Sequence, residues 1–331
     1  MIETIYVEQS CIGSDRVQTI IKRFPRTRIL ECEFYSQVFN RAGQNFRLQK
    51  KLPCLILAQK HKGFVLPAPA GYGIGGKHNF YFSHMLNCLY DCRYCFLQGM
   101  YRSANYVLFV NYEDFATDIE RKIVEHGQDS VYFFSGYDCD SLALEPVSRF
   151  VEFILPVFAR NPQAYLELRT KSTQVRQLLD IQAVLPNVIV AFSLSPEKIV
   201  QAFEIKTPSL QKRISAMQKL QAKGWPIGLR FDPVLLFENY ELTYKEFFHT
   251  VFTSLDIEKI HSVSLGGFRM PKHFHEKILK LYPEEPLLSA GMQSDKSLVA
   301  YRPDDEKELL AFCQAEILKY IQPDQYFPCQ Y

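Results

Sequence analysis

The stretch that decides the fold reads Ser83-His-Met-Leu-Asn-Cys88-Leu-Tyr-Asp-Cys92-Arg-Tyr-Cys95-Phe-Leu-Gln98. Three of the chain's nine cysteines are crowded into eight residues, with the spacing C-x3-C-x2-C. They follow a predicted strand at 79–82, where a loop would leave the carboxyl end of that strand. Three thiolates on one short loop can bind three irons of a 4Fe-4S cube and leave the fourth iron open to a small molecule.

Two other readings of this loop stay open at the sequence level. A structural zinc site normally has four ligands, often in two C-x2-C pairs, but here there is no second pair and only His78 and His84 lie nearby. Three unliganded thiols near a core are the other alternative, because cysteine is often buried. The clustering directly after a strand favours the open iron–sulfur site over both.

Strand and helix patterns alternate along most of the chain. Helical spacing separates the strands, for example Phe115, Ile119 and Ile123 after Asn111. Six βα units favour an α/β fold built on an incomplete (β/α)6 barrel, with an open doubly wound sheet as the competitor. The predicted strands lie at 79–82, 131–135, 164–169, 188–194, 227–231 and 262–265.

The proline- and glycine-rich segment at 67–76 is predicted to be a linker and sets a domain boundary. Residues 1–75 are then a small N-terminal α/β extension, and residues 76–285 form the barrel. Residues 286–331 form a C-terminal segment that is a candidate for substrate contact.

Composition limits the class of protein. The chain has 331 residues, 47% of them hydrophobic, with 38 basic against 36 acidic side chains. That length and hydrophobic content permit a sizeable core, and the charge balance neither requires nor excludes a nucleic-acid partner. No apolar stretch approaches a membrane span, and the first residues lack the apolar run of a secretory signal, so we expect a cytoplasmic protein with mostly free or metal-bound thiols.

The cysteine motif resembles the signature of the radical S-adenosylmethionine enzymes, and the chain as a whole resembles the spore photoproduct lyase family over residues 50 to 275. That family repairs DNA by splitting a thymine–thymine photoproduct. The segments that carry the resemblance are Cys95-Phe-Leu-Gln98 with Tyr94, Tyr106 to Asn111 followed by Glu113, Asp140-Ser-Leu-Ala-Leu-Glu145, Thr170-Lys171, Phe192-Ser193, Phe203-Glu204 with Thr207, Lys212-Arg213-Ile214 and Ser264-Leu-Gly.

The resemblance implies a radical S-adenosylmethionine barrel with Cys88, Cys92 and Cys95 as ligands of a 4Fe-4S cluster. S-adenosylmethionine would chelate the open iron and be cleaved to methionine and a 5′-deoxyadenosyl radical. That radical would take a hydrogen atom from C6 of the lesion, after which the bridge between the thymines breaks and a hydrogen atom returns to the product radical. The implied partners are damaged duplex DNA and a one-electron donor such as a flavodoxin or ferredoxin, with no membrane partner.

The resemblance also implies contacts to S-adenosylmethionine from strand ends that carry Lys171 and Ser193, with Ser195 as a further candidate. A cation and hydroxyl groups suit a zwitterionic ligand. An ordinary solvated lysine and serines that form a turn before Pro196 are the plainer alternatives.

The hydrogen-return step is where this sequence departs from the family. The family uses a cysteine after the second barrel strand, and Cys139 lies almost at that spacing. Aligning 140–145 instead places Tyr137 at the donor position and Cys139 two residues beyond it. A second tyrosine of the family's relay falls on Phe96, which has no hydroxyl group, whereas Tyr94 remains. An inert buried thiol is the alternative reading of Cys139.

A duplex substrate needs cations along its backbone and a means of extruding the damaged bases. Tyr301 next to Arg302 pairs an aromatic ring with a guanidinium, which suits base stacking and phosphate contact. Solvated surface charge is the alternative for every one of these residues. The candidates are Arg230, Arg269, Lys272, Tyr301 and Arg302, with Arg102 and Lys296 as further cations.

The sequence therefore predicts an iron–sulfur lyase that repairs dimerised thymines. One rival is an enzyme of the same fold with a different substrate, motivated by Tyr137 and Phe96. The other is a zinc-binding module that grips nucleic acid without catalysis.

Overall fold

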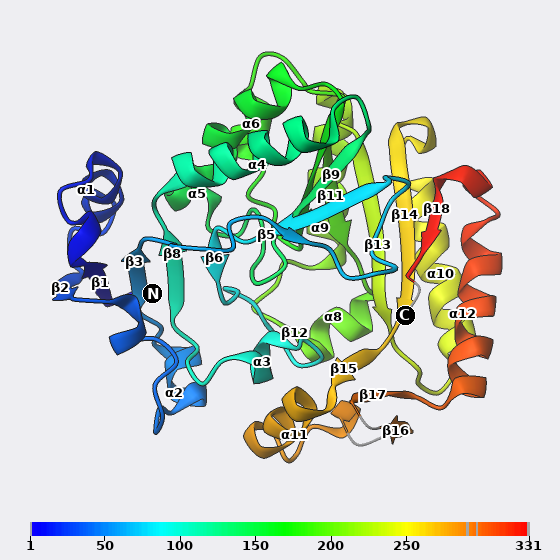
Figure 1. The fold of residues 1–331 in the computed structure, drawn as a ribbon. Coiled ribbons are helices and arrows are strands. Elements are labelled where there is room, and N and C mark those ends of the chain that lie inside the picture. The colour runs from blue at the N-terminus through cyan, green and yellow to red at the C-terminus, as the bar shows by residue number, and fades with distance from the viewer. Residues whose placement is uncertain (1, 289–290, 296, 330–331) are drawn as a thin grey trace.

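A computed structural model describes residues 2–288, 291–295 and 297–329. Its main feature is a curled eight-stranded sheet that forms half of a barrel (Figure 1). From one edge to the other the strands are β18 (Tyr326–Pro328), β14 (Ile260–Gly267), β13 (Ile227–Val234), β11 (Val188–Ser193), β10 (Ala164–Thr170), β9 (Val131–Ser135), β5 (His78–Phe82) and β4 (Leu66–Pro67).

The six predicted barrel strands are confirmed. They lie side by side in chain order from β5 to β14, and every neighbouring pair is parallel. The two edge strands were not predicted. β18 adds in parallel to β14, whereas β4 pairs antiparallel with β5. The expected incomplete barrel is correct, and the two short edge strands extend it.

Side-chain alternation separates the two faces of this sheet. Phe133, Leu166 and Val190 belong to the main hydrophobic core, which also contains residues of the surrounding helices. The helices of the barrel layer are α4 (Tyr112–His126), α5 (Glu145–Ser148), α6 (Phe150–Arg160), α7 (Arg176–Asp180), α8 (Glu197–Phe203), α9 (Leu210–Lys223) and α10 (Tyr240–Thr253). Asn111 immediately precedes α4, as the sequence predicts, and Gly224 directly follows α9.

The proline- and glycine-rich segment at 68–76 is not a free linker. Ile74 is buried with Tyr132 and Ile189, and Phe327 of β18 packs against this cluster. A Cβ atom on Gly76 would lie 2.1 Å from the ring of Tyr132, so only glycine permits so close an approach. The segment therefore packs on the barrel's inner face, and we call residues 68–76 the strap.

A second sheet of five strands stands beside the barrel. Its three strands from the N-terminal region pair in parallel, but β8 and β6 come from beyond residue 75. The boundary at residue 75 therefore stays a prediction. The strand order is β2 (Arg28–Cys32), β1 (Thr4–Glu8), β3 (Leu55–Ala58), β8 (Tyr106–Phe109) and β6 (Met85–Leu86), and the region's helices are α1 (Asp15–Lys22) and α2 (Phe46–Lys51).

The C-terminal segment returns to the barrel after a small three-stranded sheet. α12 (Pro303–Ile317) contacts α10 and β14 and leads the chain back to β18 (Figure 1). Residues 326–329 thereby lie beside the carboxyl half of β14. The small sheet has the order β15 (Arg269–Pro271), β17 (Leu298–Tyr301) and β16 (Met292–Ser294), and α11 (Lys272–Leu281) follows β15.

Glu145 is a buried carboxyl group at the junction of α5 and α6. It accepts hydrogen bonds from the amide of Val151 and the hydroxyl of Ser148, both at 3.0 Å, but burial raises its pKa to about 7. The unfolded chain ionises near the ordinary value, so the folded state holds a proton that the unfolded state loses as the pH rises. Stability therefore falls between the ordinary pKa and about pH 7.

We expect Glu145→Gln to stabilise the fold above about pH 7, by roughly 1–3 kcal/mol, and to have little effect near pH 4. Thermal unfolding of both proteins followed by circular dichroism across this range measures the difference. A gain that is constant with pH would contradict the prediction.

Among the residues described, no helix has the length and apolar character needed to cross a membrane.

Candidate active site

The three clustered cysteines lie in the loop that follows β5. This loop is held by a short antiparallel pairing in which Cys92 of β7 (Asp91–Cys92) stands opposite Glu204 of β12 (Glu204–Ile205). The amide of Arg93 also donates to the carbonyl of Phe203 at 2.8 Å. The one-turn helix α3 (Leu97–Met100) ends the loop, and its Gln98 donates to the carbonyl of Cys92 at 3.3 Å. Backbone pairing thus fixes the cysteines at the carboxyl end of the barrel.

All three thiols are free, and burial raises the pKa of each. Two lysines counter this effect: Lys50 lowers the pKa of Cys88 and Cys95, and Lys171 lowers that of Cys92 and Cys95. Without metal the thiols hold their protons, so metal binding must release them. Soft, closely coupled thiols flanked by cations suit an iron–sulfur cluster that carries net negative charge. For a single metal ion, no group of three or more His, Cys, Asp or Glu side chains is found in the part of the chain described.

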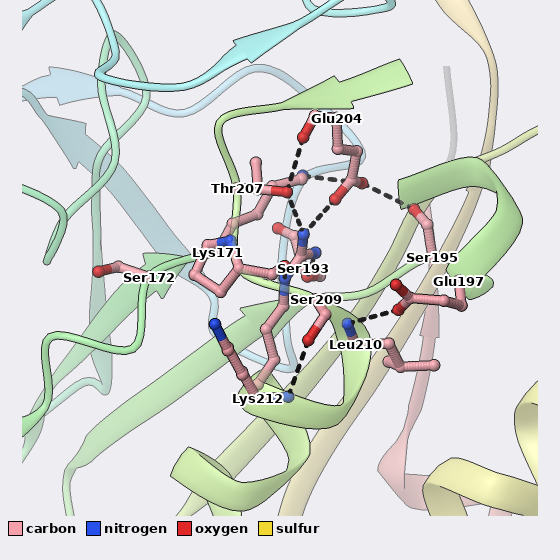
Figure 2. Close-up of polar contacts among 12 residues, drawn as sticks. Lys171, Ser172, Ser193, Ser195, Glu197, Glu204, Thr207, Ser209, Leu210 and Lys212 are labelled. Carbon is pink, nitrogen blue, oxygen red and sulfur yellow. Dashed lines mark hydrogen bonds and ion pairs between the residues drawn. The ribbon is translucent and has the colours of Figure 1, made fainter. Parts of the chain in front are cut away.

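A buried polar network centred on Glu204 lies beside the cysteines. Arg213 donates to Glu204 and to Thr207, and both members of the Arg213–Glu204 ion pair are fully buried. Ser195 donates to Glu204 at 2.9 Å, a hydrogen bond drawn as a dashed line in Figure 2. Burial alone would raise the pKa of Glu204, but Lys171 and Arg213 lower it below the ordinary value. Glu204 is therefore a fixed anion next to the cysteine loop.

The predicted S-adenosylmethionine residues all belong to this region. Lys171 follows β10, and its Nζ lies 3.9 Å from Glu204 Oε1 and 5.6 Å from the ring centre of Tyr94. Ser193 ends β11, and its carbonyl accepts from Arg213 at 3.0 Å. Figure 2 shows Lys171 and Ser193 near Glu204, with Ser195 on the far side of that carboxylate. The structure thus brings Lys171, Ser193 and Ser195 together around Glu204 and its partner Arg213.

Tyr94, the remaining relay candidate, contacts the Glu204 network. Its hydroxyl donates to Glu204, and its ring is buried between the cysteine loop and this network. The structure therefore gives it a contact that orients Glu204. Sequence analysis gave Glu204 and Arg213 no role, although the segments that carry the family resemblance include both.

An open cavity lies on the inner face of the half-barrel, beside the carboxyl ends of β5, β9 and β10. Tyr137 lines it and is 38% exposed, and its ring lies 4.4 Å from that of Tyr81 and 5.6 Å from that of Phe96. Phe96 directly follows Cys95, so this aromatic group connects the cavity to the cysteine loop. The lining residues are Tyr81, Phe134, Ser135, Gly136, Tyr137, Arg169, Ser264 and Cys329, together with strap residues 68, 69 and 71–74.

Cys139 does not line this cavity. It is 8% exposed and belongs to the separate hydrophobic cluster of the N-terminal sheet, with Met85, Leu108 and Leu144. Gly136, where φ is +87°, begins a turn through Tyr137 and Asp138 that is closed by the amide of Cys139 donating to the carbonyl of Gly136 at 3.4 Å. This turn leaves Tyr137 on the cavity and Cys139 in the hydrophobic cluster of the N-terminal sheet. Residue spacing in the sequence does not reveal such a turn.

Two of the five predicted nucleic-acid contacts require correction. Arg230 is 1% exposed inside the barrel, where it pairs with Glu167 at 2.7 Å and donates to Ser262 at 2.8 Å. Tyr301 is also buried, and its hydroxyl accepts from the amide of Leu236 at 3.0 Å. Neither residue can meet a phosphate or a base, because its polar groups are already used in the core.

Of the other cations predicted to contact nucleic acid, those that the structure describes lie at the protein surface or at the edge of the cavity. Arg269 pairs with Asp232 at 3.0 Å and donates to Tyr72 of the strap at the edge of the cavity. Lys272 is exposed at the start of α11, and Arg102 is exposed. Arg302 is exposed and pairs with Asp305 at 2.7 Å. Lys296 lies outside the described residues.

Comparison with known proteins places this geometry in a family. The family model described as "Spore photoproduct lyase" matches residues 79–298, which include the cysteine loop, every parallel strand from β5 to β14 and the Glu204 network. The chain belongs to the spore photoproduct lyase family. Family membership and the half-barrel together support an enzymatic lyase.

Individual relatives agree with this assignment. The chain is 24% identical over 294 residues to a protein named spore photoproduct lyase from Bacillus subtilis (strain 168), covering 86% of this chain and 83% of the relative. A solved spore photoproduct lyase variant with bound AdoMet and dinucleoside spore photoproduct has a TM-score of 0.87 at 18% identity, over 100% of this chain and 99% of the other. Another, complexed with dinucleoside spore photoproduct, has a TM-score of 0.84 and covers 100% and 98%. These two likenesses show the fold.

Proposed function

We propose that the protein is a radical S-adenosylmethionine enzyme that repairs DNA by breaking the carbon–carbon bond of a thymine–thymine photoproduct. The observation that carries the proposal is the family's cysteine loop, held at the carboxyl end of a half-barrel beside an open aromatic cavity. Relatives and solved structures with the same fold are named for this reaction. In this reaction the residues of the chain would have two tasks, which are to hold the cofactors and to place the lesion.

The residues around the cysteine loop fit a 4Fe-4S cluster and S-adenosylmethionine. Cys88, Cys92 and Cys95 would hold the cluster, and Lys171 would bind the carboxylate of S-adenosylmethionine while Ser193 contacts its ribose. When bound, the two cofactors supply a 5′-deoxyadenosyl radical that removes a hydrogen atom from the substrate. The Glu204 network orients Lys171, because its carboxylate is itself fixed by Arg213 and Tyr94.

The cavity suits the lesion itself. Tyr81, Phe96 and Tyr137 form an aromatic wall of mutually tilted rings, on one of which a thymine ring can stack. Exposed Lys272 and Arg302 and the partly buried Arg269 are the remaining candidates for phosphate contact, on one side of the barrel mouth. A lesion in duplex DNA would have to be turned out of the helix to reach this wall. We propose residues 286–331 as the segment that completes the substrate side, with a flavodoxin or ferredoxin as electron donor.

Lys171→Met is expected to weaken binding of S-adenosylmethionine about tenfold to a hundredfold, because it removes a charge-assisted hydrogen bond worth about 1.5–3 kcal/mol. Iron content should stay unchanged. Equilibrium dialysis with labelled S-adenosylmethionine on the reconstituted protein measures the affinity. Lys212→Met, at an exposed site on α9 that Figure 2 places nearby, is the matched control and should bind normally. Equal affinities of the two variants would contradict the assigned role.

Anaerobic reconstitution followed by reduction tests the proposed function. The native protein should take up about four irons, form 5′-deoxyadenosine and convert dinucleoside spore photoproduct to thymidine. Colourless protein that binds zinc and no iron would overturn the proposal in favour of the binding module.

A different substrate for the same fold is favoured by one observation: the family's donor position carries Tyr137, and Cys139 is buried in another core. Formation of 5′-deoxyadenosine without any conversion of the photoproduct would support that alternative.

A further inference from the structure

We propose that Cys329, delivered by the C-terminal strand, is the thiol that returns a hydrogen atom to the product radical in this enzyme. The inference rests on the proposed function and assigns a catalytic residue that lies outside the residues matched by the family model. It answers the difficulty that Cys139 lies outside the cavity.

Backbone pairing fixes Cys329 at the cavity. β18 runs parallel to β14, and the amide of Cys329 donates to the carbonyl of Leu265 at 2.8 Å, which continues the pairing by one residue. Phe327 of the same strand packs on the strap, 3.2 Å from where a Cβ atom of Gly75 would lie. The thiol therefore lines the same cavity as Tyr137 from the opposite edge of the half-barrel.

The cavity carries a second, independent sign that it receives a ligand. The hydroxyl groups of Ser135 and Ser264 line it and are buried, with the residues 2% and 5% exposed. Neither hydroxyl has a hydrogen-bond partner within the described chain. Because buried polar groups are normally satisfied, these two are free to bind polar edges of a ligand such as thymine carbonyl and imide groups.

The surroundings of Cys329 keep the hydrogen on sulfur. Its Sγ donates to Asp232 Oδ2 at 3.6 Å. Burial and the carboxylate of Asp232 raise the pKa of this thiol to about 12, against the opposing effect of Arg269 and Arg169. A thiolate has no hydrogen atom to give, so a donor must stay protonated. Tyr137 is the competing donor, but thiols transfer hydrogen to carbon radicals faster than phenols do.

The step balances. The S–H bond of Cys329 breaks homolytically while a C–H bond forms at the carbon radical left after the thymines separate. The carbon product becomes closed-shell thymine, and the unpaired electron passes to sulfur. The S–H bond would be restored by a hydrogen atom from 5′-deoxyadenosine, which bound S-adenosylmethionine would supply and which would carry the atom taken from the lesion.

Four variants of the reconstituted protein test the inference: Cys329→Ala, Cys329→Ser, Cys329→Trp and Cys139→Ala. After reduction in the presence of dinucleoside spore photoproduct, the thymidine formed per 5′-deoxyadenosine is measured. We expect Cys329→Ala and Cys329→Ser to lower this ratio at least about tenfold, because neither side chain has a weak bond to hydrogen, and Cys139→Ala to keep the native ratio. Circular dichroism establishes that each variant is folded, and the serine variant preserves the shape of the site.

Binding is measured separately on the unreduced protein, by calorimetric titration with dinucleoside spore photoproduct. Cys329→Trp should weaken binding at least about tenfold by filling the cavity, whereas Cys139→Ala should bind normally. A native product ratio in Cys329→Ala, or native affinity in Cys329→Trp, would overturn the inference while leaving the proposed function intact. Failure of the native protein to convert the photoproduct would overturn both.

Discussion

Cys92→Ala yields a protein that binds no complete cluster and cleaves no S-adenosylmethionine. Cys92 is the most buried of the three clustered thiols and stands opposite Glu204 in the β7–β12 pairing. Three thiolates bind three of the four irons, so loss of the Cys92 thiolate leaves a second iron without a protein ligand. We expect 5′-deoxyadenosine to fall at least about a thousandfold, as when a metal site is lost outright. Iron and sulfide analysis with chromatography of the nucleoside products checks both parts.

The matched control for this variant is Cys54→Ala. Cys54 is also a free, partly buried thiol, but it lies just before β3, in the N-terminal sheet. It should keep the native iron content and the native rate. Should Cys92→Ala still hold about four irons and form 5′-deoxyadenosine, the assignment of Cys92 as a ligand is wrong.

The barrel could be predicted because its signals are local. β9 (Val131–Ser135) and β11 (Val188–Ser193) are runs of β-branched and aromatic residues buried on both faces, and each is followed by a helix with regular apolar spacing. A loop after a parallel strand must leave at its carboxyl end, so the place of the cysteine loop follows from the strand before it. The family resemblance then supplied roles that spacing alone does not give.

The parts that could not be predicted depend on contacts between distant segments. β18 pairs with β14 although the two strands are some 60 residues apart in the sequence. The residues around Tyr326 do not show the apolar pattern of a barrel strand. Arg230 looks like a strand-end cation until Glu167, 63 residues earlier, is seen to neutralise it inside the barrel. Cys139 and Tyr137 are two residues apart, but the turn at 136–139 leaves Tyr137 on the cavity and Cys139 in the core of the N-terminal sheet. The sequence therefore predicts the position of the cysteine loop after its strand, and it misplaces residues such as Arg230 whose partners are far away.

Glu204→Ala is expected to have the largest effect on stability, lowering the free energy of unfolding by about 3–5 kcal/mol. Arg213 would be left as a charge with no exposed surface and without its ion-pair partner, and Ser195 and Tyr94 would lose their acceptor. Urea denaturation followed by circular dichroism measures the change. Glu113→Ala is the matched surface control, because Glu113 also pairs with an arginine, Arg16 at 2.7 Å, but is largely exposed. It should cost less than about 1 kcal/mol.

A double variant separates the loss of the ion pair from the burial of an unpaired charge. If the cost of Glu204→Ala arises from the stranded guanidinium, Glu204→Leu combined with Arg213→Met should recover much of the stability, since both charges are then absent. The double variant should nevertheless bind S-adenosylmethionine poorly, because Lys171 Nζ loses the carboxylate that lies 3.9 Å away. A stable double variant with native affinity would show that the network only supports the fold. Recovered stability with weakened binding would show that Glu204 positions Lys171 for its ligand.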